Sequence, residues 1–179
     1  TASPVYPRGV STFEERPIKE LLMDALNAAK SAGATWADAR IGRYRQNFVG
    51  TREKQIVQVG DSDSIGIGIR ALVNGAWGFT ATNLVEPAAA RTAAEQAVAI
   101  ARANAVLTTR KVVLAGADKV VTSWTSAFKR DPFSVPLDSK IAFLMKLNEA
   151  ALGVAGVSFV SSQILFADEQ KYFASSEGS

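Results

Sequence analysis

The first candidates for chemistry are basic side chains interleaved with aromatic rings between positions 40 and 54. They are Arg40, Arg43, Arg45, Arg52 and Lys54, with Tyr44 and Phe48 among them. Arginine beside aromatic rings can grip single-stranded nucleic acid, because bases stack on rings and cations bind the phosphates. The commonest reason for such a run is a charged face in solvent, and a third reading is a groove wall that meets peptide carboxylates or peptide backbone. Since the net charge of the chain is only +3, nucleic acid is the least favoured partner.

Four glycines form the second candidate, in the stretch "DSIGIGIRALVNGAWGFTATN" at positions 66, 68, 75 and 78. A phosphate-binding loop needs a glycine-rich turn that opens a helix. Here alternating Ile residues predict a strand over 65–73, and Asn74-Gly75 predicts a hairpin turn into the return strand "AWGFTAT". Phosphate binding is therefore disfavoured, and we expect another segment to approach Gly66 and Gly68 closely.

The remaining candidates are weaker. Asp61 and Asp63 in "GDSDS" lack the closing Glu of an EF-hand loop, so they predict a turn capped by its own side chains. Ser139 and Lys140 in "DSK" suit a helix N-terminus better than a nucleophile with its base. The chain contains no Cys and no His, which excludes thiolate and imidazole chemistry within it. We expect no catalytic residue and no metal ligand here, and the substrate-binding residues are unknown.

Three helices are predicted from apolar residues that recur every three or four positions. The first begins at Pro17 and ends before Gly33, with a buried stripe of Ile18, Leu21, Leu22, Ala25, Leu26 and Ala29. The second follows Pro87, and its inward stripe is mostly small: Ala90, Ala93, Ala94, Ala97, Ile100 and Ala101. Small side chains allow close approach, so we expect this helix to lie against Gly66 and Gly68. The third is "LDSKIAFLMKLNEAALG", ended by Gly153.

Strands fill most of the remaining sequence. Residues 35–48 and 52–59 predict two strands joined by a turn at Asn47–Thr51, before the hairpin at Asn74-Gly75. Two strand-like pieces lie within 110–126, and residues 157–175 alternate like one long strand or a hairpin that turns at Asp168–Lys171. Tight hairpins imply antiparallel pairing. We therefore predict an α+β fold, with a mainly antiparallel sheet and three helices packed on it.

The chain is expected to divide into an N-terminal arm at 1–16, a helix–antiparallel sheet–helix sub-block at 17–105 and a second α/β sub-block at 106–179. No apolar run reaches the ~18 residues of a membrane span, so we expect no membrane partner. The first residue is Thr, and the ending "FASSEGS" lacks a closing element. We expect a portion of a longer chain, truncated before its catalytic region.

Several segments together resemble one protein family. "WADARIG", "GIGIRALVNGAWGFTATN", the Ala-rich "AAEQAVAIARA", "RDPFSVPLDSK" and "KYFASSEGS" are similar, in this order, to the N-terminal region of the TldD/PmbA family, once described as modulators of DNA gyrase. The resemblance runs from about Ile18 to the end and leaves out the arm at 1–16. The segment "KYFASSEGS" is more TldD-like than PmbA-like.

The resemblance implies a role without chemistry of its own. TldD-type members are zinc metallopeptidases whose ligands lie on a His-Glu-x-x-x-His helix further along the chain, so no metal or catalytic residue carries over here. They act on peptides or unfolded chains in an internal cavity, as dimers with themselves or with a PmbA/TldE-like subunit. This stretch would help to assemble the dimer and wall the cavity, with Arg43, Arg45 and Arg70 as possible wall residues. Zinc is expected only in the full-length parent.

Two other functions stay open. The chain could belong to a PmbA-like partner subunit that holds no metal and acts as a scaffold, or it could be a nucleic-acid-binding module. The expected location is the cytoplasm, or outside it if an export signal precedes Thr1.

Overall fold

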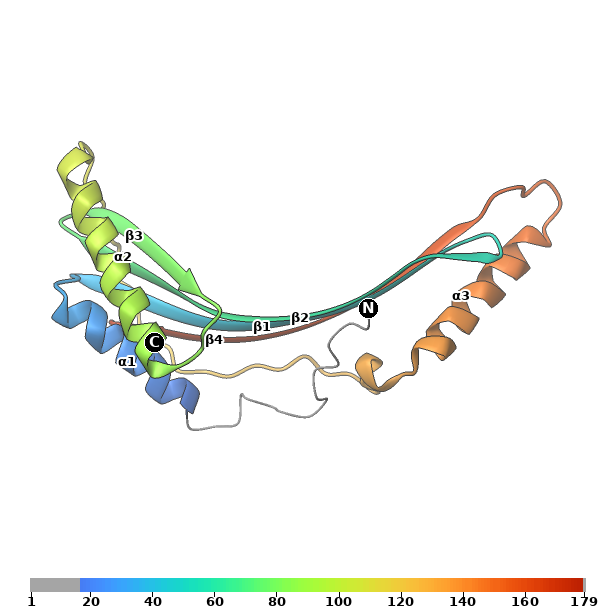
Figure 1. The fold of residues 1–179 in the computed structure, drawn as a ribbon, viewed down its shortest axis with the longest axis horizontal. Coiled ribbons are helices and arrows are strands. Elements are labelled where there is room, and N and C mark those ends of the chain that lie inside the picture. The colour runs from blue at the N-terminus through green and yellow to red at the C-terminus, as the bar shows by residue number, and fades with distance from the viewer. Residues whose placement is uncertain (1–16, 179) are drawn as a thin grey trace, which may run out of the picture. The chain divides into compact units, whose positions relative to one another are not determined.

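The computed structural model describes residues 17–178, so the predicted arm at 1–16 lies outside the described residues. The helices are α1 (Pro17–Ser31), α2 (Pro87–Leu107) and α3 (Leu137–Leu152), and a short 3-10 helix covers Pro132–Ser134. The strands are β1 (Trp36–Arg52), β2 (Gln55–Val73), β3 (Ala76–Thr82) and β4 (Ser161–Ser175), which form one sheet in the order β3-β2-β1-β4 (Figure 1). The predicted α+β class with antiparallel pairing is confirmed.

The pairing is antiparallel across the sheet. β2 and β3 pair from Val73 with Ala76 to Ile67 with Thr82, around the predicted turn at Asn74-Gly75, where both residues have positive φ. β1 and β4 also run in opposite directions. The amide of Glu53, just after β1, donates to Val160, just before β4, while the amide of Ser176, just after β4, donates to Ala37 in β1.

The chain divides into two compact units that interleave along the sequence. Within the described residues, the first unit holds 17–41, 66–121 and 172–178, and the second holds 42–65 and 122–171. β1, β2 and β4 each contribute residues to both units. The units therefore follow a different division from the consecutive blocks 17–105 and 106–179.

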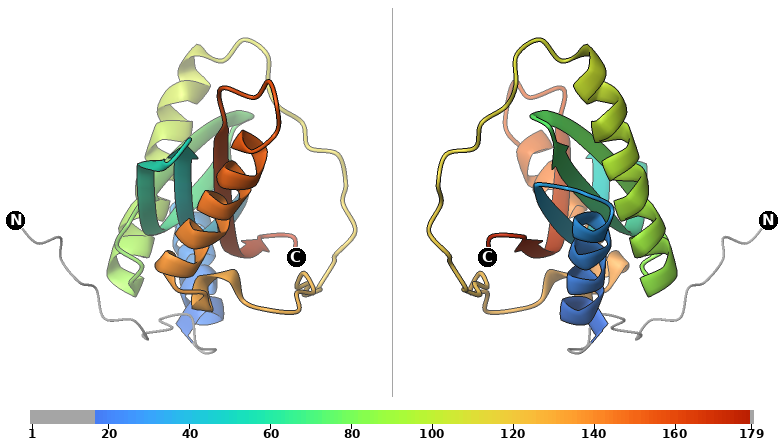
Figure 2. Two further views of the ribbon diagram at one scale, coloured as in Figure 1. Left: turned by 90° about the vertical axis from the view of Figure 1, so that its right-hand side faces the viewer. Right: turned by 90° about the vertical axis from the view of Figure 1, so that its left-hand side faces the viewer.

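The core of the first unit lies between its sheet and the two helices α1 and α2, which lie side by side (Figure 2). Every member of the predicted α1 stripe is buried, as are Ala37, Ala39 and Ile41 on β1 and Ile67, Ile69 and Ala71 on β2. The predicted α2 stripe is correct except at one position. Ile100 is 42% exposed, and Val98 is buried in its place.

Helix α2 packs against Gly78 on β3. The prediction that it packs against Gly66 and Gly68 is wrong. Gly78 pairs with Ala71 and so lies on the face of the buried isoleucines. A Cβ there would overlap the carbonyl oxygen of Ala97 and lie 2.5 Å from the amide nitrogen of Ala101. Residues alternate between the two faces of a strand, so Gly66 and Gly68 lie on the face away from the helix.

Two predicted turns are absent, because β1 and β2 are longer than expected. β1 runs through Asn47–Thr51 and turns only at Glu53 and Lys54, and β2 runs straight through "GDSDS". Gly50 accommodates an aromatic ring instead of bending the chain. A Cβ at this position would lie 3.2 Å from Cε1 of Phe48.

The strand pieces predicted within 110–126 are also wrong. This segment has no strand pairing in the structure, although Val112 donates a backbone hydrogen bond to Gly75. An alternating Val-rich sequence forms a strand only when a neighbouring strand completes the ladder. The hairpin alternative for residues 157–175 is wrong as well, since β4 continues through Asp168–Lys171 as one strand.

Candidate functional site

The sheet face of the first unit that lies away from α1 and α2 carries a cluster of arginine and aromatic side chains. At its centre the Asp38 carboxylate is 1% exposed and accepts hydrogen bonds from Arg70. Arg70 Nε lies 3.1 Å and 3.0 Å from the two carboxylate oxygens, and Nη2 also donates to Oδ2. The hydrogen bonds to Asp38 raise the pKa of Arg70. The pair joins β1 to β2.

The Arg70 guanidinium also makes cation–π contacts with two tryptophan rings. Its Cζ lies 5.7 Å from the ring centroid of Trp36 and 5.5 Å from that of Trp77. The two rings meet edge to face, with centroids 5.4 Å apart and an interplanar angle of 85°. Cation–π contacts of this kind fix the plane of a guanidinium as well as stabilise it. The side chain of Arg70 is nevertheless 43% exposed.

A second arginine shares the same carboxylate. Arg40 Nη2 lies 3.9 Å from Asp38 Oδ2, and Arg40 Cζ lies 5.1 Å from the ring centroid of Phe173 on β4. The side chain of Arg40 is 53% exposed. Two guanidinium groups therefore surround one buried carboxylate, and both reach solvent.

Gly66 and Gly68 form the floor beside this cluster. A Cβ at Gly68 would lie 3.2 Å from the ring of Phe79, and one at Gly66 would lie 3.1 Å from the carbonyl oxygen of Thr82. Phe79 is directly opposite Arg70 in the β2–β3 register. The two glycines thus leave room for the Phe79 ring on the open face. They form neither a phosphate loop nor a contact with α2, the two roles considered from the sequence.

Arg43 and Arg45 of the basic run belong to the second unit and are paired with carboxylates. Arg43 binds Asp63 with two hydrogen bonds of 3.0 Å and 2.5 Å, and this contact lowers the pKa of Asp63. Arg45 lies 3.8 Å from Asp168, and its Cζ lies 4.4 Å from the ring centroid of Phe133. Asp63 is therefore a strand residue in an ion pair and not a turn cap.

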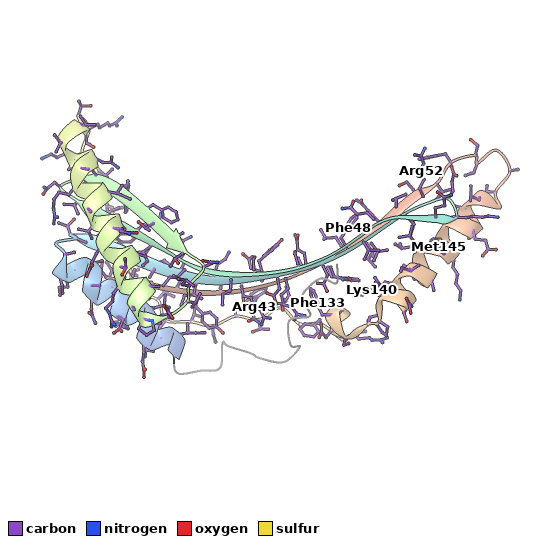
Figure 3. All side chains as sticks on the ribbon, viewed as in Figure 1. Arg43, Phe48, Arg52, Phe133, Lys140 and Met145 are labelled. Atoms are coloured by element: carbon purple, nitrogen blue, oxygen red, sulfur yellow. The ribbon has the colours of Figure 1, made fainter. Side chains whose placement is uncertain are left out.

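The Ser139-Lys140 pair lies in the first turn of α3, as predicted, but Lys140 is buried. Figure 3 labels the Lys140 side chain on α3. Its Nζ donates to Asn47 Oδ1 at 2.8 Å and lies 4.9 Å from the ring centroid of Phe166. The amine thus binds the sheet and does not contact Ser139 as a catalytic base would.

Further along α3, Asn148 is fully buried and completes a polar network. It donates to Thr51 Oγ1 at 3.1 Å and to the Glu53 carbonyl at 2.9 Å, and it accepts from Ser162 Oγ at 2.6 Å. The network attaches α3 to β1 and β4. Because every polar group in the network has a hydrogen-bond partner, the network is typical of a structural contact between a helix and a sheet.

The donor set does not fit a zinc ion. Structural and catalytic zinc is bound mainly by Cys and His, and the chain has neither. Within residues 17–178 no group of three or more Asp or Glu side chains comes together as a metal site. No step of metal chemistry can be derived from these residues.

Residues 37–101 match the family model of PmbA/TldA metallopeptidase domain 1. They include the arginine–aromatic cluster apart from Trp36 and Phe173. The chain is therefore similar to the N-terminal region of TldD/PmbA-family proteins, as its sequence motifs predict. No curated protein sequence matches the chain.

Three crystal structures of similar fold extend the comparison beyond the TldD/PmbA domain model. A protein described as a modulator of DNA gyrase from Bacteroides thetaiotaomicron has 19% identity and a TM-score of 0.71, over 89% of this chain and 37% of its own. A second modulator of DNA gyrase, from Thermotoga maritima, has 16% identity and a TM-score of 0.68, over 90% and 36%. TldE from Thermococcus kodakarensis has 13% identity and a TM-score of 0.69, over 91% and 35%.

The chain thus spans little more than a third of the length of these relatives, which share its fold.

Among the described helices, none is long and apolar enough to span a membrane.

Proposed function

We propose that this chain is the non-catalytic N-terminal part of a TldD-like zinc metallopeptidase that degrades or processes peptides or unfolded chains. The observation that carries the proposal is the match of residues 37–101 to a metallopeptidase first domain, in a chain with no His or Cys to hold zinc. The metal and the catalytic groups would then come from residues after Ser179. This chain would contribute to dimer assembly and to the wall of the substrate cavity.

The arginine–aromatic cluster supports the role of a cavity wall. Of the three arginines considered for the wall, Arg70 lies on the open sheet face of the first unit, beside Trp77 and Phe79. Arg43 and Arg45 belong to the second unit, where Asp63 and Asp168 neutralise them. Arg70 is therefore the one whose surroundings suit a peptide surface.

A PmbA-like partner subunit is the second candidate, and the similarity to TldE favours it. Such a subunit would use the same sheet to build the dimer and would hold no metal anywhere. The parent sequence after Ser179 separates the two proposals. A His-Glu-x-x-x-His segment supports the peptidase, and its absence supports the partner subunit.

A nucleic-acid module is less well supported. Within residues 17–178, Arg43 and Arg45 are paired with carboxylates, Arg52 stacks on Phe159, and Arg40 stacks on Phe173. Phosphate binding through counterion release gives a log–log salt slope of about −0.9 per phosphate neutralised. We expect no DNA binding with such a slope.

The test of the proposed function is a peptidase assay on the full-length parent. We expect hydrolysis of unfolded polypeptide that a chelator abolishes and added zinc restores, because the zinc-bound water supplies the nucleophile in such enzymes. A parent that carries the His-Glu-x-x-x-His segment and binds zinc, yet cleaves no unfolded polypeptide, would overturn the proposal.

A further inference from the structure

The charge at the centre of the arginine–aromatic cluster is unbalanced. Arg40 and Arg70 are both within ion-pair distance of Asp38, and the Asp38 carboxylate is their only ion-pair partner among the described residues. The three groups together carry one net positive charge. Asp38 is buried beneath them, so the unbalanced charge faces solvent on the guanidinium groups.

Both arginines keep hydrogen-bond donors that are unused among the described residues. In the described part of the chain, Arg70 uses Nε and Nη2 for Asp38, and its Nη1 forms no hydrogen bond. Among the described residues, Arg40 makes only the 3.9 Å ion pair with Asp38 and the stacking contact with Phe173. A guanidinium has five N–H donors, and it binds carboxylate best through two of them at once. Both arginines therefore keep donors for an added carboxylate.

The side chains around the two arginines include exposed aromatic rings. Phe79 is 59% exposed and Phe173 is 44% exposed, and the ring of Trp77 adjoins Arg70. Gly66 and Gly68 contribute no side chain to this face. An extended peptide could lie on such a floor, with a carboxylate at the arginines and apolar side chains on the rings.

One further carboxylate lies beside the cluster, and among the described residues it forms no ion pair with Arg40 or Arg70. It belongs to Glu177, which accepts a hydrogen bond of 3.0 Å from Trp36 Nε1 and lines a pocket together with Lys30. A net charge of about +1 is suited to a single carboxylate, whereas nucleic acid needs several cations along its phosphates.

We propose that Arg40 and Arg70 form a subsite for one carboxylate of an extended peptide, with Phe79, Trp77 and Phe173 contacting the apolar side chains beside it. The inference rests on the proposed function, since it assigns this face to peptide substrates. The carboxylate could come from an Asp or Glu side chain or from the C-terminus of the peptide.

Binding of labelled peptides to the full-length parent tests the subsite. The probes are short peptides that alternate Val with Glu, and the same peptides with Gln, each with an amidated and with a free C-terminus. Measured by fluorescence anisotropy at low salt, a carboxylate should improve affinity about tenfold, as expected for a charge-assisted bidentate contact. If only the Glu side chains give the gain, the source is the side chain; if only the free C-terminus does, the source is the chain end.

Arg40→Gln is the first variant, because Arg40 is exposed and its loss leaves the Asp38–Arg70 pair intact. It should abolish most of the carboxylate preference. The matched control is Arg91→Gln in the same unit, since Arg91 is 51% exposed and pairs with Asp24 on the helical side. The control should bind like the wild type. The double variant Asp38→Asn with Arg70→Met removes the second guanidinium without leaving Asp38 as an unpaired charge, and it too should lose the preference.

Equal affinity for the Glu and Gln peptides, or equal loss in Arg40→Gln and Arg91→Gln, would overturn the subsite. So would a single-stranded oligonucleotide that displaces the Glu peptide at lower concentration than the unlabelled peptide does. Hydrolysis of a neutral peptide by the parent separates this result from the proposed function. If that hydrolysis persists while the carboxylate preference is absent, the subsite fails and the peptidase stands.

Discussion

Gly78 on β3 lies directly beneath the backbone of Ala97 on α2. A Cβ at position 78 would overlap the Ala97 carbonyl oxygen, and it would lie 3.0 Å from the Cβ of Ala101. The small stripe of α2 and this glycine together let the helix approach the sheet at backbone distance. The packing of the first unit thus depends on a missing side chain.

Gly78→Ala should therefore destabilise the protein strongly. The added methyl group meets backbone, which cannot rotate away, so we expect a loss of about 2–3 kcal/mol, at the upper end of overpacking effects. Thermal or urea unfolding measures the loss. Gly42→Ala is the control, because a Cβ at Gly42 meets no heavy atom within 4 Å, and equal effects of the two substitutions would refute the close contact.

The buried carboxylate of Asp38 should contribute more to stability than an exposed one. Asp38→Asn removes the charge that neutralises Arg70, and we expect a loss of about 1–3 kcal/mol, reduced from the fully buried case because Arg70 reaches solvent. Asp24→Asn, which breaks the exposed pair with Arg91, should cost less than about 1 kcal/mol. Urea unfolding measures the loss of stability in both variants. A larger loss in Asp24→Asn than in Asp38→Asn would contradict the burial of the Asp38–Arg70 pair.

The buried Asn148 of α3 should contribute more to stability than an exposed apolar side chain of the same helix. Asn148→Ala removes the donor to the Glu53 carbonyl and the acceptor of the Ser162 hydroxyl, which keeps its contact with Thr51, and we expect this to cost about 1–3 kcal/mol. Phe143 on the same helix is 54% exposed, and Phe143→Ala should change stability by less than about 1 kcal/mol. Unfolding monitored by circular dichroism distinguishes them, and the reverse order of effects would show that α3 packs differently.

Acid should weaken the second unit through Asp63. Its pKa in the folded state is lowered by the hydrogen bonds from Arg43, so the stabilisation is present above the unfolded-state value of about 3.9 and is lost as pH falls through the folded-state pKa. The drop in urea midpoint between about pH 5 and pH 3 should be smaller in Asp63→Asn than in the wild type. Asp61→Asn, in the same strand and without an ion pair among the described residues, should retain the full drop.

Local sequence signals predicted the helices and one hairpin well. The stripe of α1 and the Pro17 and Gly33 boundaries depend on spacing within one element. Asn74-Gly75 depends on a positive φ that these two residue types tolerate. Such features need no information about the rest of the chain.

The features that failed depend on residues distant in sequence. The turn predicted at Asn47–Thr51 is absent because β1 continues beside β4, where Thr51 donates to Ser162, 111 positions away. The strands within 110–126 were predicted from β-branched residues, yet a strand exists only with a partner. The Asp38–Arg70 pair spans 32 positions, and the one available signal was a lone acid that shares strand parity with Trp36 and Arg40.

The most direct test of the account is the zinc content of residues 1–179 and of the full-length parent, measured by mass spectrometry after dialysis against a weak chelator. The account predicts about one zinc per parent chain and none in residues 1–179, because zinc sites in proteins are built mainly from Cys and His. Zinc retained by residues 1–179, together with peptide hydrolysis that a strong chelator stops, would contradict it.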